Sequence, residues 1–193
     1  MQFTIATIAL LSTLAAAAPT TNVARGTGDT FNLVLTSVNL APEDLEILNA
    51  GNWVVASRNL RAELVPDRTQ ANLFYQYSPE DRIGTASTGL VITPGGTATI
   101  SSGKPVELVN NNGTSGITIL TNDDGLPALS YDEGRFQACV DDQGIFLSHI
   151  AAGQRQLAAC ASVDLVSVCS SIGVGGPLTG QLGKPVAVDC YSS

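Results

Sequence analysis

The sequence predicts an all-β protein, folded as an antiparallel β-sandwich or a closed barrel. Three observations support this prediction. Short runs of β-forming residues recur along the chain, Gly, Pro, Asn and Asp separate them at intervals of roughly 8–12 residues, and helical periodicity is nearly absent. A β-trefoil is the alternative fold. It should show three similar repeats, whereas the hairpin-like segments near residues 45, 107 and 136 are unevenly spaced.

The first half of the chain begins with a run of β-formers at Phe31–Val38 that ends before Pro42. Leu45–Leu48 and Trp53–Ala56 flank a polar, glycine-containing turn, so we expect a hairpin there. Pro42 followed by acidic residues also allows one helical turn at the start of this region. Four further runs each end at turn-forming residues: Ala62–Val65, Asn72–Tyr77, Gly89–Thr93 and Thr97–Ile100.

The second half continues the same pattern. Val106–Val109 and Gly116–Leu120 flank an asparagine-rich turn, and Arg135–Val140 and Ile145–Ile150 flank Asp-Asp-Gln-Gly. Ala159–Val168 is expected to be a last, long strand.

The two ends of the chain differ from the middle. Phe3–Leu14 is apolar and uncharged and runs into Ala15–Ala18, the pattern of a secretory signal peptide, which we place at residues 1–17. This stretch is shorter than the roughly 20 residues that span a bilayer. We expect residues 18–29 to be flexible, residues 30–168 to form the β domain, and residues 169–193 to form a Gly/Ser-rich tail closed by a disulfide, with its central loop disordered.

Composition limits the partners of the protein. The chain has 9 Lys and Arg against 17 Asp and Glu, a net charge of −8, with no basic cluster, so its surface repels phosphate backbones and we expect no nucleic-acid partner. No second apolar stretch of membrane length follows the first, and the C-terminus carries no lipid-anchor signal. We therefore expect a secreted monomer, extracellular or held at the cell wall, with no membrane contact.

Four cysteines, Cys139, Cys160, Cys169 and Cys190, lie in the last third of the chain. An even number of cysteines behind a signal peptide predicts two disulfides, for which three pairings exist. There is no C-x-x-C spacing and His149 is the only histidine, so we expect neither a metal site nor a cofactor.

Candidates for catalysis have simpler structural explanations. His149 lies in an apolar run and is expected to pack at a sheet edge, and the chain has no G-x-S-x-G motif. Three acidic pairs precede glycines, where acidic residues cap turns, so we predict no enzyme active site. A carboxylate hydrolase or a calcium-binding loop is the alternative for these pairs, which are Asp123–Asp124, Asp132–Glu133 and Asp141–Asp142.

Two features bear on carbohydrate. Trp53, Tyr75 and Tyr77 could stack on sugars, but with aromatic residues at only 5% of the chain we expect them in the core. Asn112-Gly113-Thr114 is the only N-glycosylation sequon, set in an asparagine-rich turn, and predicts modification at the surface.

The segments Gly134–Cys139, Gly144–Ile150 and Ala159–Val166, together with Phe31–Val34 and Leu45–Trp53, resemble the fungal secreted cell-wall proteins of the PhiA type. Val140 stands where that family has proline, the family's earlier cysteines are missing, and the tail with its two cysteines is additional. The resemblance implies a Cys139–Cys160 bridge, which leaves Cys169–Cys190 as the second. It also implies a non-catalytic structural protein of the fungal exterior or wall, with cell-wall polysaccharide as its partner. A glycan-binding module or a secreted effector is the alternative function.

Overall fold

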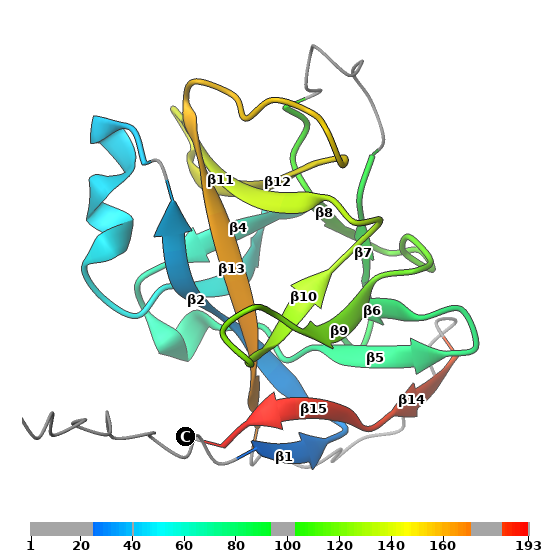
Figure 1. Ribbon diagram of the computed structural model, residues 1–193. Helices are drawn as coiled ribbons and strands as arrows, with labels where there is room; N and C mark the ends of the chain where they lie inside the picture. The colour runs from blue at the N-terminus through cyan, green and yellow to red at the C-terminus, as the bar shows by residue number, and fades with distance from the viewer. Residues whose placement is uncertain (1–24, 40, 94–102, 171–182, 193) are drawn as a thin grey trace, which may run out of the picture.

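The computed structural model describes residues 25–39, 41–93, 103–170 and 183–192. The expected signal peptide and the strand expected at Thr97–Ile100 lie outside these residues. The described chain is almost entirely β-structure, which confirms the predicted all-β class (Figure 1). The choice among sandwich, barrel and trefoil stays a prediction.

The elements are β1 (Arg25–Gly28), β2 (Phe31–Asn39), η1 (Glu43–Asn49), β3 (Val54–Arg58), β4 (Arg61–Val65), η2 (Arg68–Gln70), β5 (Tyr75–Ser78), β6 (Arg82–Gly84), β7 (Gly89–Val91), β8 (Glu107–Val109), β9 (Thr118–Thr121), β10 (Pro127–Ser130), β11 (Arg135–Asp141), β12 (Gly144–Ile150), β13 (Cys160–Cys169), β14 (Lys184–Val186) and β15 (Val188–Tyr191).

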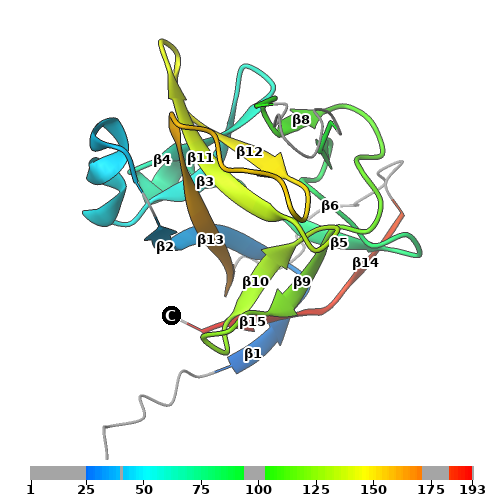
Figure 2. The same cartoon turned by 45° about the horizontal axis from the view of Figure 1, so that its top comes forward.

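The strands form one connected sheet. Its main path runs β1-β15-β13-β11-β12-β4-β8-β7-β6-β5-β14, with β2, β3, β9 and β10 attached beside this path. The pairing of β13 with β15 is parallel, and the other named pairs are antiparallel. Strand β13 is the hub, because it pairs with β2, β10, β11 and β15. Figure 2 shows β13 beside β2 and β11, with η1 to one side.

Alternation along β2 and β13 produces two apolar faces. Leu33 and Leu35 of β2 join Val163 and Leu165 of β13 in the main core. The opposite face carries Val34, which packs with residues of β3 and β4 in a second, smaller cluster. Because successive side chains of a strand point to opposite faces, the same sequence that builds the core also places valines on the outer side.

The hairpin expected from Leu45–Leu48 and Trp53–Ala56 is wrong. Leu45 and Leu48 lie in η1, a 3₁₀-helix of seven residues that is also longer than the single turn that Pro42 suggested. A spacing of three residues places both leucines on one side of a three-residue turn, where both are buried. Trp53 and the start of β3 still form part of the core and sheet.

Strand β1, and strands β14 and β15 after Cys169, were not predicted from the sequence. Strand β1 lies within residues 18–29, which were expected to be flexible, and it pairs with β15 from the predicted tail (Figure 1). A side chain at Gly26 would meet Ser192 Oγ at 2.9 Å, and one at Gly28 would meet Cys190 Sγ at 3.3 Å. These glycines therefore permit close approach of two strands, and the tail beyond Cys169 contributes β14 and β15 to the sheet.

Candidate functional site

The four cysteines form two disulfides, as predicted. Cys139 bonds Cys160, and Cys169 bonds Cys190. This is the pairing that the family resemblance implied. The first bridge joins neighbouring positions of β11 and β13, and the second joins the end of β13 to β15.

His149 packs against two aromatic rings. Its ring makes edge contacts with Tyr131 and Phe136, at centroid distances of 5.0 and 5.2 Å, and Nε2 lies 3.1 Å from the carbonyl oxygen of Tyr131. Burial lowers the pKa of His149, while the Tyr131 contact and the charge of Asp132 oppose that shift. Burial thus favours the neutral imidazole, and Nε2 lies against the Tyr131 carbonyl. His149 is a packed strand histidine, as expected, but the expected position at a sheet edge is wrong, because β12 lies between β11 and β4.

The acidic pairs lie in turns, but only one pair caps its turn through a carboxylate. Asp141 Oδ1 accepts hydrogen bonds from the N–H groups of Gln143 (2.9 Å) and Gly144 (3.2 Å). In the turn containing Asp123 and Asp124, the capping oxygen belongs to Asn122, which accepts from Leu126 N.

At the third acidic pair, Asp132 and Glu133 adopt left-handed backbone conformations with φ of 47° and 51°. The turn closes through Gly134 N, which donates to the Tyr131 carbonyl at 3.0 Å. The prediction of turn positions holds for all three pairs, and carboxylate capping is wrong for two of them. No cluster of three or more His, Cys, Asp or Glu suited to a metal ion occurs among the described residues.

The three aromatic candidates for sugar stacking are buried. Trp53, Tyr75 and Tyr77 are 6%, 6% and 1% exposed. Tyr77 donates its hydroxyl to the Thr85 carbonyl at 2.7 Å, and burial together with the neighbouring Tyr75 raises its pKa to about 12. These rings pack the interior, as the low aromatic content suggested. Asn112 lies exposed in the loop between β8 and β9.

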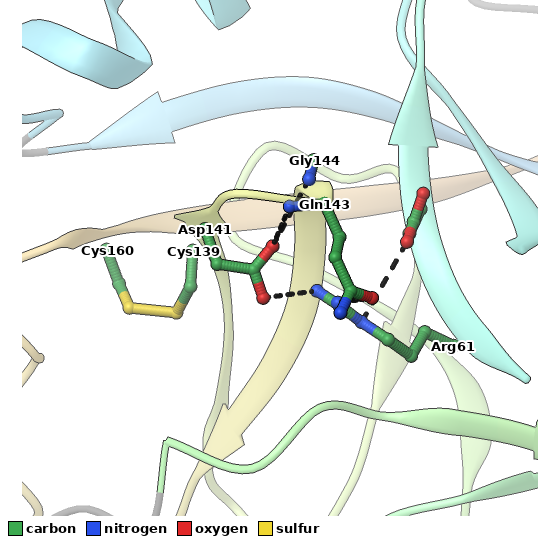
Figure 3. Close-up of polar contacts among 7 residues, drawn as sticks. Arg61, Cys139, Asp141, Gln143, Gly144 and Cys160 are labelled. Atoms are coloured by element: carbon green, nitrogen blue, oxygen red, sulfur yellow. Dashed lines mark hydrogen bonds and ion pairs between the residues drawn. A yellow bond between two sulfur atoms is a disulfide. The ribbon is translucent and has the colours of Figure 1, made fainter. Parts of the chain in front are cut away.

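A charged cluster that the sequence did not predict joins β4 to the β11–β12 hairpin. Arg61 Nη1 donates to Gln143 Oε1 at 2.9 Å, and Nη2 lies 3.1 Å from Asp141 Oδ2 (Figure 3). Glu63 Oε1 is 3.8 Å from Arg61 Nε, and the guanidinium lies 4.4 Å from the centre of the Phe146 ring. Arg61 and Glu63 are only 9% and 4% exposed.

This cluster links β4 to the β11–β12 hairpin through side-chain contacts. The ladder between β12 and β4 contains one paired position, Phe146 with Glu63, so side chains carry much of the contact between these strands. Desolvation acts to raise the pKa of Asp141, but the hydrogen bond from the Gln143 N–H and the charge of Arg61 outweigh it. The net effect is that the pKa of Asp141 is lowered. The carboxylate therefore stays ionised and paired with Arg61.

A groove of about 580 Å³ lies over β2, β3 and β13. Its floor is apolar, formed by Val34 of β2, Val54 of β3, and Val166 and Val168 of β13. Ladder pairs of Val34 with Val166 and with Val54 hold these strands side by side. A rigid sheet thus supports an aliphatic surface below the rim.

Polar side chains also line the groove, among them Asn52 and Arg68. Ala71, Leu126 and Tyr191 line the groove as well. Arg68 is exposed and donates to Asn52 Oδ1 at 3.0 Å. It is the one charged side chain among the described residues that line the groove. Because a guanidinium has five N–H donors, this bond to Asn52 uses only part of its capacity.

Sequence reasoning missed both the charged cluster and the groove. Their residues come from segments that are distant in the sequence, and the groove valines are the alternate positions of strands that the sequence did predict. The partial signal was the apolar character of both faces of β13, where Val163, Leu165, Val166 and Val168 are all apolar. Strands that are apolar on both faces are buried on both, or carry a surface for a partner or ligand.

The fold and these features define the class of the protein, a disulfide-linked all-β protein with an apolar groove on one face of its sheet. The chain belongs to the family described as Domain of unknown function (DUF7907), whose model matches residues 64–169. No curated protein and no solved structure matches the chain. The family match runs from the end of β4 through β13 and includes the Cys139–Cys160 bridge, whereas Cys190 lies beyond it. The resemblance to PhiA-type wall proteins stays a prediction.

Proposed function

We propose that this protein is secreted and acts outside the cell by binding, without catalysis, and that the groove over β2, β3 and β13 is its binding site. The groove is the observation that carries the proposal. Its volume of about 580 Å³ lies within the roughly 300–1,000 Å³ of small-molecule sites, and its apolar floor with a few polar groups at the rim is typical of them.

The lining favours one chemical class of ligand. Aliphatic valines at the floor suit an apolar body, and Arg68 with Asn52 at the rim suits an anionic end. We therefore propose an amphipathic small molecule with a carboxylate or a similar group. Tyr191 is the one aromatic side chain among the described residues that line the groove, and Trp53, Tyr75 and Tyr77 are buried in the interior, so the groove offers little aromatic surface on which sugars could stack.

The extracellular location is supported by the two disulfides, because such bonds persist in oxidising compartments. The signal-peptide pattern at residues 1–17 agrees with it. No helix in the described part of the chain has the length and apolar character needed to span a membrane. The fungal source, the wall association and a structural role are what the family resemblance implies, and they remain predictions.

A fluorescence titration with anilinonaphthalene sulfonate, which has an aromatic body and one anionic group, tests the site. We expect saturable binding at one site. Ala71→Trp, which fills the groove, should weaken binding at least tenfold, and Arg68→Gln should weaken it several-fold. Ile47→Trp, at a residue 57% exposed on η1, and Arg58→Gln are the matched controls. Equal affinity in Ala71→Trp and in its control would refute the groove as the site.

The polysaccharide partner expected from the resemblance is tested separately by retention on insoluble chitin and β-glucan. Saturable retention that Ala71→Trp leaves unchanged would replace the proposed small molecule with a glycan bound elsewhere. Absence of retention, together with groove binding, supports the proposal.

A further inference from the structure

The loop between β8 and β9 contains the only sequon of the chain, Asn112-Gly113-Thr114. Asn112 is exposed, whereas Gly113 and Thr114 are partly buried against β7. The three residues of the sequon therefore have different surroundings in the folded protein.

Thr114 holds this loop in place through its hydroxyl. Thr114 Oγ1 accepts from Ile92 N at 2.9 Å and donates to the Ile92 carbonyl at 3.3 Å, and Thr114 N donates to the Leu90 carbonyl at 2.9 Å. A side-chain hydroxyl thus takes the place of a backbone partner beside β7.

The neighbours of Asn112 are fixed by local contacts. Asn111 Oδ1 accepts from Gly113 N at 2.8 Å, and Gly113 has a φ of +73°. A side chain at Gly113 would meet the carbonyl oxygen of Leu90 at 2.9 Å, so glycine is required by both backbone and space. Asn112 is consequently presented at the surface by a loop that its neighbours build.

We infer that Asn112 carries an N-linked glycan and that Thr114 serves twice, first as the sequon hydroxyl and then as the tie between the loop and β7. The inference rests on the proposed secretion. The co-substrate is a lipid-linked oligosaccharide diphosphate. A bond forms between Asn112 Nδ2 and the anomeric carbon, the bond from that carbon to the phosphate oxygen breaks, the lipid diphosphate leaves, and the amide proton passes to a base.

The order of events follows from the two tasks of Thr114. The transferase needs the sequon hydroxyl, and in the folded protein both hydrogen-bonding roles of that hydroxyl are directed at Ile92. Glycan transfer therefore precedes closure of the loop on β7. The attached glycan then lies at an exposed position and displaces none of the contacts that hold the loop.

The test is expression of the full chain in a eukaryotic secretory host, with mass spectrometry of the intact glycopeptide from the medium. An intact glycopeptide is required because an Asn-Gly pair deamidates spontaneously and mimics the mark left by enzymatic deglycosylation. We expect the glycan on wild type, on Thr114→Ser and on the control Asn111→Asp, and its loss in Asn112→Gln and Thr114→Val. Of the last two variants, only Thr114→Val should have a lower melting temperature than deglycosylated wild type.

The outcomes separate this inference from the proposed function. Secreted, disulfide-bonded protein without a glycan at Asn112 overturns the inference alone. Protein that stays in the cytosol with free thiols overturns both. Equal melting temperatures for Asn112→Gln and Thr114→Val refute the second task of Thr114. Transfer onto the folded, unglycosylated protein by microsomes, at the rate seen for its unfolded form, refutes the order of events.

Discussion

Cys139 and Cys160 face each other across the antiparallel pair of β11 and β13, and their disulfide spans Cα atoms 4.2 Å apart. The second bridge has a different task. Cys169–Cys190 links the end of β13 to β15, and β15 in turn pairs with β1. One disulfide thus reinforces the pair of β11 and β13, and the other attaches β15, and through it β1, to β13.

Removal of either disulfide by paired Cys→Ala substitution should cost about 3 kcal/mol in the chain-entropy model, because each bridge closes a loop of 21 residues. The two variants should differ in where they open. Loss of Cys169–Cys190 should selectively expose the amides of β1 and β15 to hydrogen exchange, whereas loss of Cys139–Cys160 should leave them protected. Identical exchange patterns in the two variants would contradict the assigned tasks.

Arg61 is expected to be essential for the contact between β4 and the β11–β12 hairpin. Arg61→Met should destabilise the protein by about 3 kcal/mol, because it leaves the buried Glu63 carboxylate without its counter-charge. Adding Glu63→Gln to Arg61→Met should recover most of this loss. Urea denaturation of the two single variants and the double variant measures the coupling.

The matched control for Arg61 is Arg82, whose ion pair with Glu80 lies at a more exposed position. Arg82→Met should cost less than about 1 kcal/mol. A cost for Arg61→Met no larger than that for Arg82→Met would show that the cluster contributes little to the fold.

His149 should make the stability of the protein depend on pH. Burial lowers its pKa in the folded state below the ordinary value of 6.5, so the unfolded chain takes up a proton at higher pH than the folded one. The stabilising effect of the neutral ring is complete above about pH 6.5 and is lost as pH falls from there through the folded pKa. Because His149 is the only histidine, NMR titration of its ring gives that pKa directly.

The corresponding stability measurement compares wild type with His149→Gln in urea at pH 7.5 and pH 5. The difference between the two proteins should shrink at the lower pH. A folded His149 pKa at or above 6.5 would contradict the enclosed, neutral ring.

Local pattern was sufficient to predict the β11–β12 hairpin. Arg135–Val140 and Ile145–Ile150 are runs of β-forming residues on either side of a polar turn, and the observed pairing places Asp141 opposite Gly144. The same reasoning failed at Leu45 and Leu48, because a short run of apolar residues suits a strand and a 3₁₀-helix equally, and tertiary burial decided between them.

Long-range relationships were less accessible. Residues 18–29 were expected to be flexible, but the role of Gly26 and Gly28 depends on β15 and on the disulfide at Cys190, which no local pattern reveals. The groove depends in the same way on Val34, Arg68 and Val166, which only the strand order brings together. The disulfide pairing was predicted through the family resemblance, since four cysteines alone allow three pairings.

The proposal that the protein acts by binding in its groove is tested most directly by ¹⁵N NMR during titration with anilinonaphthalene sulfonate. We predict saturating shift changes confined to amides around the groove, including those of Val34, Val54, Arg68 and Val166, with the amides of β12 and of the Asn112 loop unchanged. Saturating shift changes at amides elsewhere, or no shift changes at the groove amides up to the highest soluble concentration of the ligand, would contradict the proposal.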